Sequence, residues 1–437
     1  MVLFTTKVTA RLQYIAGFFV KEGQLGELTI TTSRAEYSEY KGAKINYSDN
    51  AIDGVEVLIK PHGLLYETGI RQQTTDLAGA GEKKTFFNTG GDIGFDIFSA
   101  SFYLLSRYEE YLPHSKDGYG RYAHENSLAF KEDFLRFPLV NFWLKDFRQL
   151  IHRKFPGSGL PDPESRLNFL PTYDIDIAWS YKHKGFWRNA GGIIRSLFKG
   201  QFGVVKYRLQ VLRGKRKDPF DSFGWLNHLH EQYKLKPYYF FLVPEKRGQY
   251  DKNIPPSCKA MQDLVRDHVI RYPIGIHPSW RSGDEPGLLK QEIETLSWLN
   301  GNRVLSSRQH YIRFNLPEGY NRLIDCGIKY DFSMGYGSIN GFRASVASAF
   351  YWYDLEKEKQ TDLLLFPFCF MEANSFYEQK QSTSQALDEM KQFYQTVKAV
   401  NGYFIMIWHN SFLGTDPLYS GWKDIYERFI TEVATGS

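Results

Sequence analysis

Two aspartates stand where their carboxylates could carry out hydrolysis. Asp174 and Asp176 lie one residue apart at the end of a short apolar segment, residues 167–170. Side chains at positions i and i+2 of an extended segment point the same way, so both carboxylates would face one site. One could hold a metal ion while the other accepts a proton. The alternative is that both cap the next turn by accepting backbone N–H groups.

Three of the eleven histidines follow apolar segments in the same way. They are His277 after residues 272–276, His310 just past residues 304–305, and His409 after residues 403–408. Any one alone is more often structural, but all three together with two carboxylates favour a site. One Asp and two His make a suitable ligand set for zinc or a similar divalent metal, with a fourth position open for water.

Two arginines are also placed at predicted strand ends. Arg308 comes two residues before His310, and Arg343 lies in Asn340-Gly341-Phe342-Arg343-Ala344. Each could pair with a catalytic aspartate and keep it ionised, or could bridge surface carboxylates instead. We favour the first interpretation and count both arginines as candidate catalytic residues.

Apolar strands alternate with helical patterns from about residue 166 to residue 437, which is typical of a parallel α/β fold. The predicted strands are 167–173, 237–243, 272–276, 302–305, 327–331, 363–369 and 403–408. The predicted helices are 221–234, 257–270, 284–300, 317–326 and 383–400. Seven such units predict a barrel, complete or incomplete, whose catalytic groups lie at the carboxyl ends of the strands.

Residues 1–165 are patterned differently and predict a smaller N-terminal α+β domain. Strand-like segments at 27–31 and 54–59 come first, and a helix over 95–111 follows. This helix would end before Pro113. Its charged residues favour a structural ion-pair cluster over a site, and they are Arg107, Glu109 and Glu110.

A basic insert at about 178–217 interrupts the second region. It contains eleven Lys or Arg and no Asp or Glu, whereas the whole chain has a net charge of only +5. Aromatic and aliphatic residues interleave with the charges, so the insert could rest on an anionic membrane surface or grip an anionic polymer. A solvated lid beside the active site is the alternative. Nucleic acid is not expected, because no recognisable binding module accompanies the charge.

Composition indicates a globular protein of two or three domains, with 42% hydrophobic and 24% charged residues among 437. Three widely spaced cysteines favour neither a disulfide framework nor a Cys-rich zinc site, so we expect a reduced, cytoplasmic setting. The longest uncharged run near the N-terminus, residues 12–20, is about half of a membrane span. The insert leaves open a peripheral membrane association.

Five motifs, taken in order, carry a resemblance to a known family. They are Thr172-Tyr173-Asp174-Ile175-Asp176, His277-Pro278-Ser279-Trp280, Ser307-Arg308-Gln309-His310-Tyr311, Gly341-Phe342-Arg343-Ala344 and Ile407-Trp408-His409-Asn410. The series resembles the polysaccharide deacetylase superfamily of carbohydrate esterases. In particular, the chain is similar to a divergent bacterial branch with an extra N-terminal domain of uncharacterised role, on the segments 102–111 and 138–141.

The resemblance implies a distorted (β/α) barrel of about seven strands and a metal-dependent removal of acetyl groups. By the same resemblance, Asp174 is the general base, Asp176 and His277 bind the metal, and His409 is the general acid. The chain departs from the family pattern in two places. Ile175 separates aspartates that are usually adjacent, and Arg281 stands where a second metal-binding histidine is usual. We assign His310 as the missing ligand from its position.

The sequence therefore predicts a metal-dependent hydrolase, with zinc as the first candidate metal, that removes N- or O-linked acetyl groups from a sugar or polysaccharide. Its place would be in envelope glycan metabolism, and the basic insert suggests a lipid-linked or anionic sugar as partner. Two alternatives remain open. The chain could be a catalytically silent relative that binds glycans or a partner protein, or a barrel amidohydrolase acting on a non-sugar amide.

Overall fold

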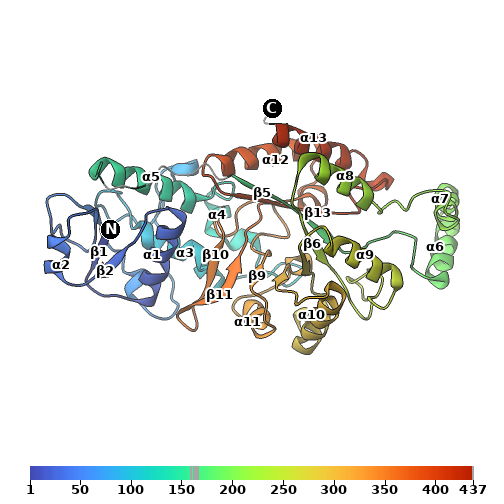
Figure 1. Ribbon diagram of the computed structural model, residues 1–437, viewed down its shortest axis with the longest axis horizontal. Helices are drawn as coiled ribbons and strands as arrows, with labels where there is room; N and C mark the ends of the chain where they lie inside the picture. The colour runs from blue at the N-terminus through green and yellow to red at the C-terminus, as the bar shows by residue number, and fades with distance from the viewer. Residues whose placement is uncertain (158–159, 161–166, 436–437) are drawn as a thin grey trace.

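The computed structural model describes residues 1–157, 160 and 167–435. Its strands form two sheets, one of four strands near the N-terminus and one of nine strands in the centre of the molecule (Figure 1). The predicted boundary between domains at residues 165 and 166 lies outside the described residues. None of the described helices combines the length and the apolar composition needed to cross a membrane.

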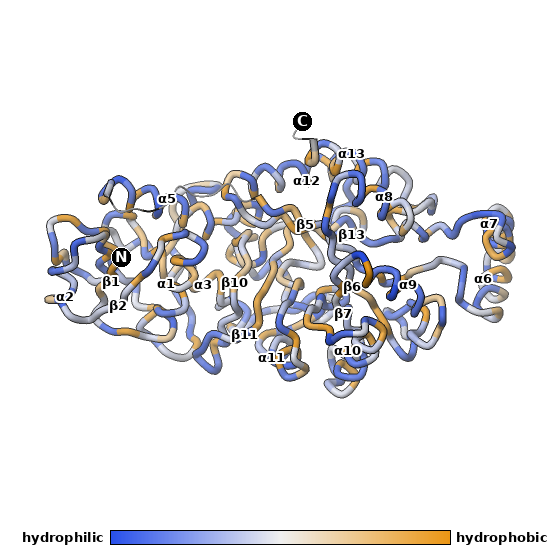
Figure 2. The backbone as a smooth tube through the Cα atoms, viewed as in Figure 1, coloured by the Kyte–Doolittle hydropathy of each residue, from blue (hydrophilic) through white to orange (hydrophobic). Residues whose placement is uncertain are grey.

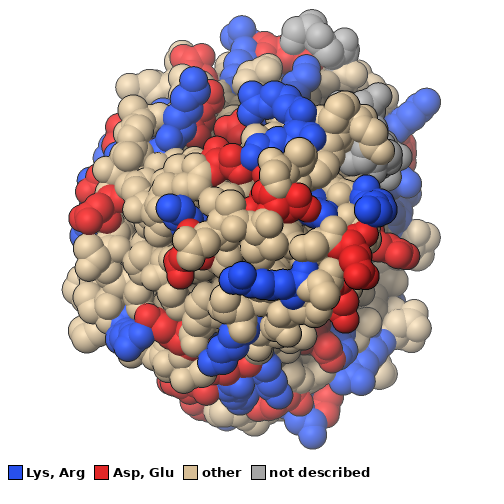
Figure 3. Space-filling model, turned by 90° about the vertical axis from the view of Figure 1, so that its left-hand side faces the viewer, with Lys and Arg blue, Asp and Glu red and all other residues tan. Residues whose placement is uncertain are grey.

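The small sheet has the strand order β2-β1-β3-β4, and all its pairings are parallel. Its strands are β1 (Val2–Thr5), β2 (Thr29–Thr31), β3 (Lys44–Tyr47) and β4 (Val57–Ile59). Helices α1 (Ala10–Glu22) and α2 (Arg34–Glu39) connect successive strands. Strands and helices therefore alternate here, which is closer to an α/β order than to the α+β order that the sequence predicts. The surface at this end carries acidic and basic side chains interspersed (Figure 3).

The helix predicted over residues 95–111 ends earlier than its pattern indicates. Helix α3 (Ile97–Leu105) stops because Arg107 adopts a left-handed backbone with φ of 55°. A short 3₁₀ turn, Tyr108–Tyr111, follows. This turn lets the buried Arg107 side chain reach Glu109 and Glu110, both at 2.7 Å, so the predicted structural ion-pair cluster is present. Two further helices complete the region, α4 (Leu128–Lys131) and α5 (Leu139–Lys154).

The large sheet has the order β10-β11-β9-β8-β7-β6-β5-β13-β12, with every pairing parallel except that of β10 with β11. The strands are β5 (Asn168–Ile175), β6 (Tyr238–Phe241), β7 (Ile274–Ile276), β8 (Ser306–Ser307), β9 (Tyr330–Asp331), β10 (Phe350–Asp354), β11 (Lys359–Leu365), β12 (Phe370–Met371) and β13 (Tyr403–His409). The predicted parallel α/β class is confirmed.

The strand count and two strand positions differ from the prediction. The sheet has nine strands rather than about seven, because β10 and β12 have no counterpart in the sequence pattern. Strand β8 lies at Ser306–Ser307 instead of 302–305, and β11 begins earlier than predicted, at Lys359. Within the described residues, no strand pairing joins the end strands β10 and β12 to close a barrel.

Helices connect the strands and cover the sheet (Figure 1). The five predicted helices are present as α8 (Phe223–Tyr233), α9 (Lys259–Val269), α10 (Pro286–Asn300), α11 (Glu318–Asp325) and α12 (Thr383–Lys398), and α13 (Trp422–Thr435) is additional. Strands β6 and β13 are mainly apolar on both faces, as is typical of parallel strands between helices. One hydrophobic core continues from the small sheet into the large one.

The basic insert forms two helices, α6 (Phe186–Phe198) and α7 (Phe202–Leu212). Figure 1 shows them standing apart from the body, at the end opposite the small sheet. Figure 2 shows that hydrophobic stretches occur in this pair of helices although it lies outside the core.

Candidate active site

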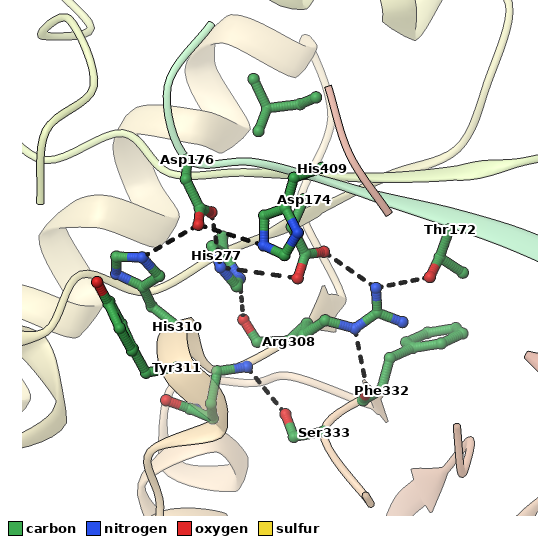
Figure 4. Close-up of polar contacts among 12 residues, drawn as sticks. Thr172, Asp174, Asp176, His277, Arg308, His310, Tyr311, Phe332, Ser333 and His409 are labelled. Atoms are coloured by element: carbon green, nitrogen blue, oxygen red, sulfur yellow. Dashed lines mark hydrogen bonds and ion pairs between the residues drawn. The ribbon is translucent and has the colours of Figure 1, made fainter. Parts of the chain in front are cut away.

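The parallel register of the large sheet brings the candidate residues to one edge. Strand β5 lies between β6 and β13, and Asp174 is paired with Phe240 on one side and His409 on the other. Asp176 follows directly after the end of β5, and His277 directly after β7. Because the carboxyl ends of parallel strands meet at the same edge, these side chains converge (Figure 4).

Asp176 lies at the centre of three imidazoles. Its Oδ1 is 3.1 Å from Nε2 of His277, and its Oδ2 is 3.4 Å from Nε2 of both His310 and His409. Burial alone would raise the pKa of Asp176, but the three histidines more than offset this and hold it well below its usual range. Asp176 is therefore an ionised carboxylate, as a metal ligand must be.

The ring orientations of His277 and His310 are set by their other nitrogens. Nδ1 of His277 donates to the backbone carbonyl of Arg308 at 2.6 Å, and Nδ1 of His310 lies 3.1 Å from Oδ1 of Asp251. Both Nε2 atoms are thereby turned toward Asp176 (Figure 4). Carbonyl and carboxylate partners of this kind orient metal-binding histidines in proteins. Burial lowers the pKa of His310, yet the carboxylates of Asp176 and Asp251 raise it to about 9.

The donor set of Asp176, His277 and His310 fits a divalent metal. One ligand atom from each residue lies within 4.8 Å of the others. Oδ1 of Asp176 is buried and accepts no hydrogen bond from the described residues beyond its 3.1 Å contact with Nε2 of His277, so it can serve as a ligand. Two imidazoles and one carboxylate are a donor set that proteins use to bind divalent metals.

Asp174 is held by a buried arginine. Nη1 of Arg308 donates to Oδ1 of Asp174 at 3.0 Å and to Oγ1 of Thr172 at 2.6 Å, and Nε donates to the carbonyl of Phe332 at 3.1 Å. The guanidinium also lies 4.4 Å from the ring centre of Phe240. Oδ2 of Asp174 is left facing the site, 3.8 Å from Nε2 of His277. Arg308 thus fixes an aspartate whose second oxygen remains able to accept a proton.

His409 is paired with a fully buried carboxylate that sequence reasoning missed. Oε1 of Glu372 lies 2.6 Å from Nδ1 of His409 and accepts its backbone N–H at 2.7 Å. Burial lowers the pKa of His409, but Glu372 and Asp176 together raise it well above the usual value. A protonated imidazole held in this way can act as a general acid.

A cavity of about 520 Å³ opens in front of these residues. Its wall includes Tyr119 and Arg121, which come from the N-terminal region. Arg121 donates to the backbone carbonyl of Tyr311 at 2.7 Å, and the Tyr119 ring centre lies 5.3 Å from that of Tyr311. Tyr250, also in the wall, stacks on Trp280 at 3.9 Å. The N-terminal region therefore completes an aromatic side of the cavity.

The structure brings together six of the seven candidate residues, namely Asp174, Asp176, His277, Arg308, His310 and His409. The assignment of Arg343 to the site is wrong. Its guanidinium binds Glu110 at 2.6 and 2.8 Å and donates to the carbonyl of Gly335. Arg343 is instead a fourth member of the buried ion-pair cluster around Arg107.

Two residues of the site, Asp251 and Glu372, were not foreseen. Glu372 directly follows β12 and ends the apolar run that begins at Leu363, so the pattern that indicated the aspartates was present there too. Asp251 lies in the segment between β6 and α9, and no periodicity marks it.

Comparisons with known proteins give one family match over part of the chain and distant structural likenesses. A model described as a family of unknown function (DUF7033) matches residues 1–156. No curated protein matches the sequence. Among solved structures, a protein assigned as a polysaccharide deacetylase from Mycobacterium smegmatis is 13% identical with a TM-score of 0.40, covering 63% of this chain and 86% of that one.

Two further structures are similarly distant. The polysaccharide deacetylase from Bacillus cereus is 11% identical with a TM-score of 0.29, covering 61% of this chain and 88% of that one. The 4-α-glucanotransferase from Thermococcus litoralis is 14% identical with a TM-score of 0.33, covering 61% and 36%. Likenesses this distant do not identify an activity.

Proposed function

We propose that the protein is a metal-dependent hydrolase that removes acetyl groups from a sugar or polysaccharide. The observation that supports this most is the arrangement of one carboxylate and two oriented imidazoles between a potential base and a potential acid. Asp174, fixed by Arg308, lies on one side, and His409, paired with Glu372, lies on the other. The five-motif resemblance points to the same chemistry.

Asp176, His277 and His310 would hold the metal, with zinc as the first to test. When bound, the metal supplies Lewis acidity for the hydrolysis of an acyl group. Oδ2 of Asp174 accepts a proton from the attacking water, and Arg308 holds this carboxylate in its orientation. Nε2 of His409 then gives a proton to the departing amine or alcohol of the sugar.

The test measures acetate release from acetylated amino-sugar oligomers by the zinc-loaded protein. Asp174→Asn should lower kcat at least about a hundredfold while zinc stays bound, because the base is lost but no ligand is. His310→Ala should instead lose zinc. Asp263→Asn, an exposed carboxylate paired with Lys259, is the matched control and should leave activity unchanged.

Full activity of Asp174→Asn would disprove the assignment of the base. If acetylated sugars release no acetate while small cyclic or linear amides are hydrolysed, the substrate is a non-sugar amide. If the protein binds zinc but turns over neither class, the chain is a binding protein and the proposed activity is wrong.

A further inference from the structure

The hairpin formed by α6 and α7 stands apart from the site as well as from the core. Among the described elements, the main packing partner of each helix is the other one. The two are also tied together by Arg208, which donates to the carbonyl of Asn189 at 3.2 Å. None of residues 178–217 lines the cavity. This arrangement does not fit a lid over the active site.

Helix α6 exposes an apolar stripe to solvent. Trp187, Ile194 and Phe198 are separated by seven and four residues, so they lie on one face of the helix. Trp187 is 85% exposed and Phe198 is 89% exposed. Phe202, at the start of α7, is exposed as well. Contiguous apolar surface of this kind marks an interaction site in a folded protein.

A row of cations runs beside the stripe. Arg188, Arg195 and Lys199 each follow one of the three stripe residues directly, and all three are exposed. At this spacing they share a face of the helix about a quarter turn from the stripe. The insert contains no carboxylate that could neutralise them. By contrast, charges of both signs are interspersed at the opposite end of the molecule (Figure 3).

The base of the hairpin is fixed next to the site. The buried Asp218 accepts the backbone N–H groups of Ser180, Tyr181 and Lys182 at 2.7 to 2.9 Å, which clamps the two ends of the insert together. Asn410, the residue after His409, donates to the carbonyl of Ile177 at 3.1 Å. The hairpin is thus rooted at the rim of the cavity, where Ile177 and Asn410 form part of the wall.

We propose that the α6–α7 hairpin docks the protein on a bilayer that contains anionic lipid. The stripe would enter the boundary between headgroups and acyl chains, while the neighbouring cations meet the lipid phosphates. An aliphatic residue, Ile194, between two aromatic ones suits acyl chains better than it suits the stacked bases or sugars of a polymer. The proposal goes beyond the proposed activity, and its test requires no substrate.

Vesicle sedimentation tests this with the full-length protein. Vesicles of phosphatidylcholine alone are compared with vesicles of equal parts phosphatidylcholine and phosphatidylglycerol. The protein should bind the anionic vesicles only. Two variants, Trp187→Ser/Ile194→Ser/Phe198→Ser and Arg188→Gln/Arg195→Gln/Lys199→Gln, should each bind at least about tenfold more weakly. Trp298→Ser, which removes an exposed tryptophan of α10, is the matched control and should bind as the wild type does.

Tryptophan emission gives a second measurement that does not depend on the triple variants folding. Anionic vesicles should shift the emission of the wild-type protein to the blue, and the shift should be absent in Trp187→Phe. Equal binding to both vesicle types, or binding to neither, would overturn the proposal. Loss of vesicle binding in the charge variant but not in the stripe variant would also overturn the proposal, because it would indicate a site for an anionic polymer. A wild-type dimer that the stripe variant converts to monomer would show that a second copy covers the stripe.

Discussion

Asp251 offers a sharp test of the metal site, because it touches a proposed ligand without being one. Its Oδ1 lies 3.1 Å from Nδ1 of His310 and also accepts the backbone N–H of Trp280 at 2.9 Å. Asp251→Asn removes the negative charge but keeps an oxygen acceptor at the same position. The backbone bond to Trp280 can therefore persist, and the substitution acts mainly on His310.

The expected size of the effect follows from what the carboxylate does. Asp251 keeps the proton on Nδ1 of His310, turns Nε2 toward Asp176 and increases the basicity of that nitrogen. Loss of such a partner typically weakens metal binding by about tenfold to a hundredfold, which is about 1.4 to 2.7 kcal/mol. His310→Ala, which removes the ligand itself, should weaken binding much further.

Zinc affinity is measured by competition with a chelator of known affinity, at one fixed pH, for the wild type and both variants. Asp284→Asn is the matched control, because Asp284 pairs with Arg313 at 2.9 Å in the same neighbourhood and makes no contact with a proposed ligand. Thermal unfolding of the zinc-free proteins establishes that Asp251→Asn remains folded.

Two results would refute the reasoning. Wild-type zinc affinity in Asp251→Asn would mean that the orientation of His310 does not depend on this carboxylate. A loss as complete as that of His310→Ala, in a folded protein, would mean that Asp251 is itself a ligand and that the assigned set is wrong.

Three further predictions concern other buried carboxylates. Glu372→Gln should lower kcat by about tenfold to a hundredfold with zinc retained, because a neutral amide stabilises protonated His409 less well; an unchanged kcat would exclude this pair as the acid. Burial raises the pKa of Glu292 from 4.5 to about 7, so its contribution to folding is lost as the pH rises through that value. The free energy of unfolding of Glu292→Gln, measured in urea, should therefore rise relative to that of the wild type by up to about 3 kcal/mol between about pH 5 and pH 8. A difference between the two proteins that does not change with pH would contradict this. Glu110→Gln should lower the free energy of unfolding, measured in urea, by about 3–5 kcal/mol, because it leaves the buried Arg343 without its carboxylate. A free energy of unfolding equal to that of the wild type would refute the role of this ion pair.

The candidate site was predictable where local pattern and sheet geometry act together. Asp176 and His277 directly follow a strand and His409 ends one, and a parallel sheet gathers such positions at one edge. Asp251 gave no such signal, since its role depends on where the segment after β6 folds back. Glu372 was missed because β12 is only two residues long and was not recognised as a strand of its own.

Arg343 shows why the other contacts could not be predicted from the spacing of residues along the chain. Both arginines are predicted at strand ends, but only Arg308 directly follows a strand, β8, whereas Arg343 lies in the segment between β9 and β10. The difference lies in the partner, since Arg308 meets Asp174 whereas Arg343 meets Glu110, which is 233 residues away in the chain. The same holds for the insert. Its charge was evident from composition, but its position away from the cavity depends on the packing of the whole fold.

Tyr119 and Arg121 have a consequence for how relatives of this protein could diverge. They belong to the N-terminal residues that match a family of unknown function, yet they form part of the cavity wall. The candidate catalytic residues lie at the edge of the large sheet, while this part of the wall comes from the N-terminal region. Substitutions confined to Tyr119 and Arg121 would therefore alter which molecules the cavity admits without removing a candidate catalytic residue.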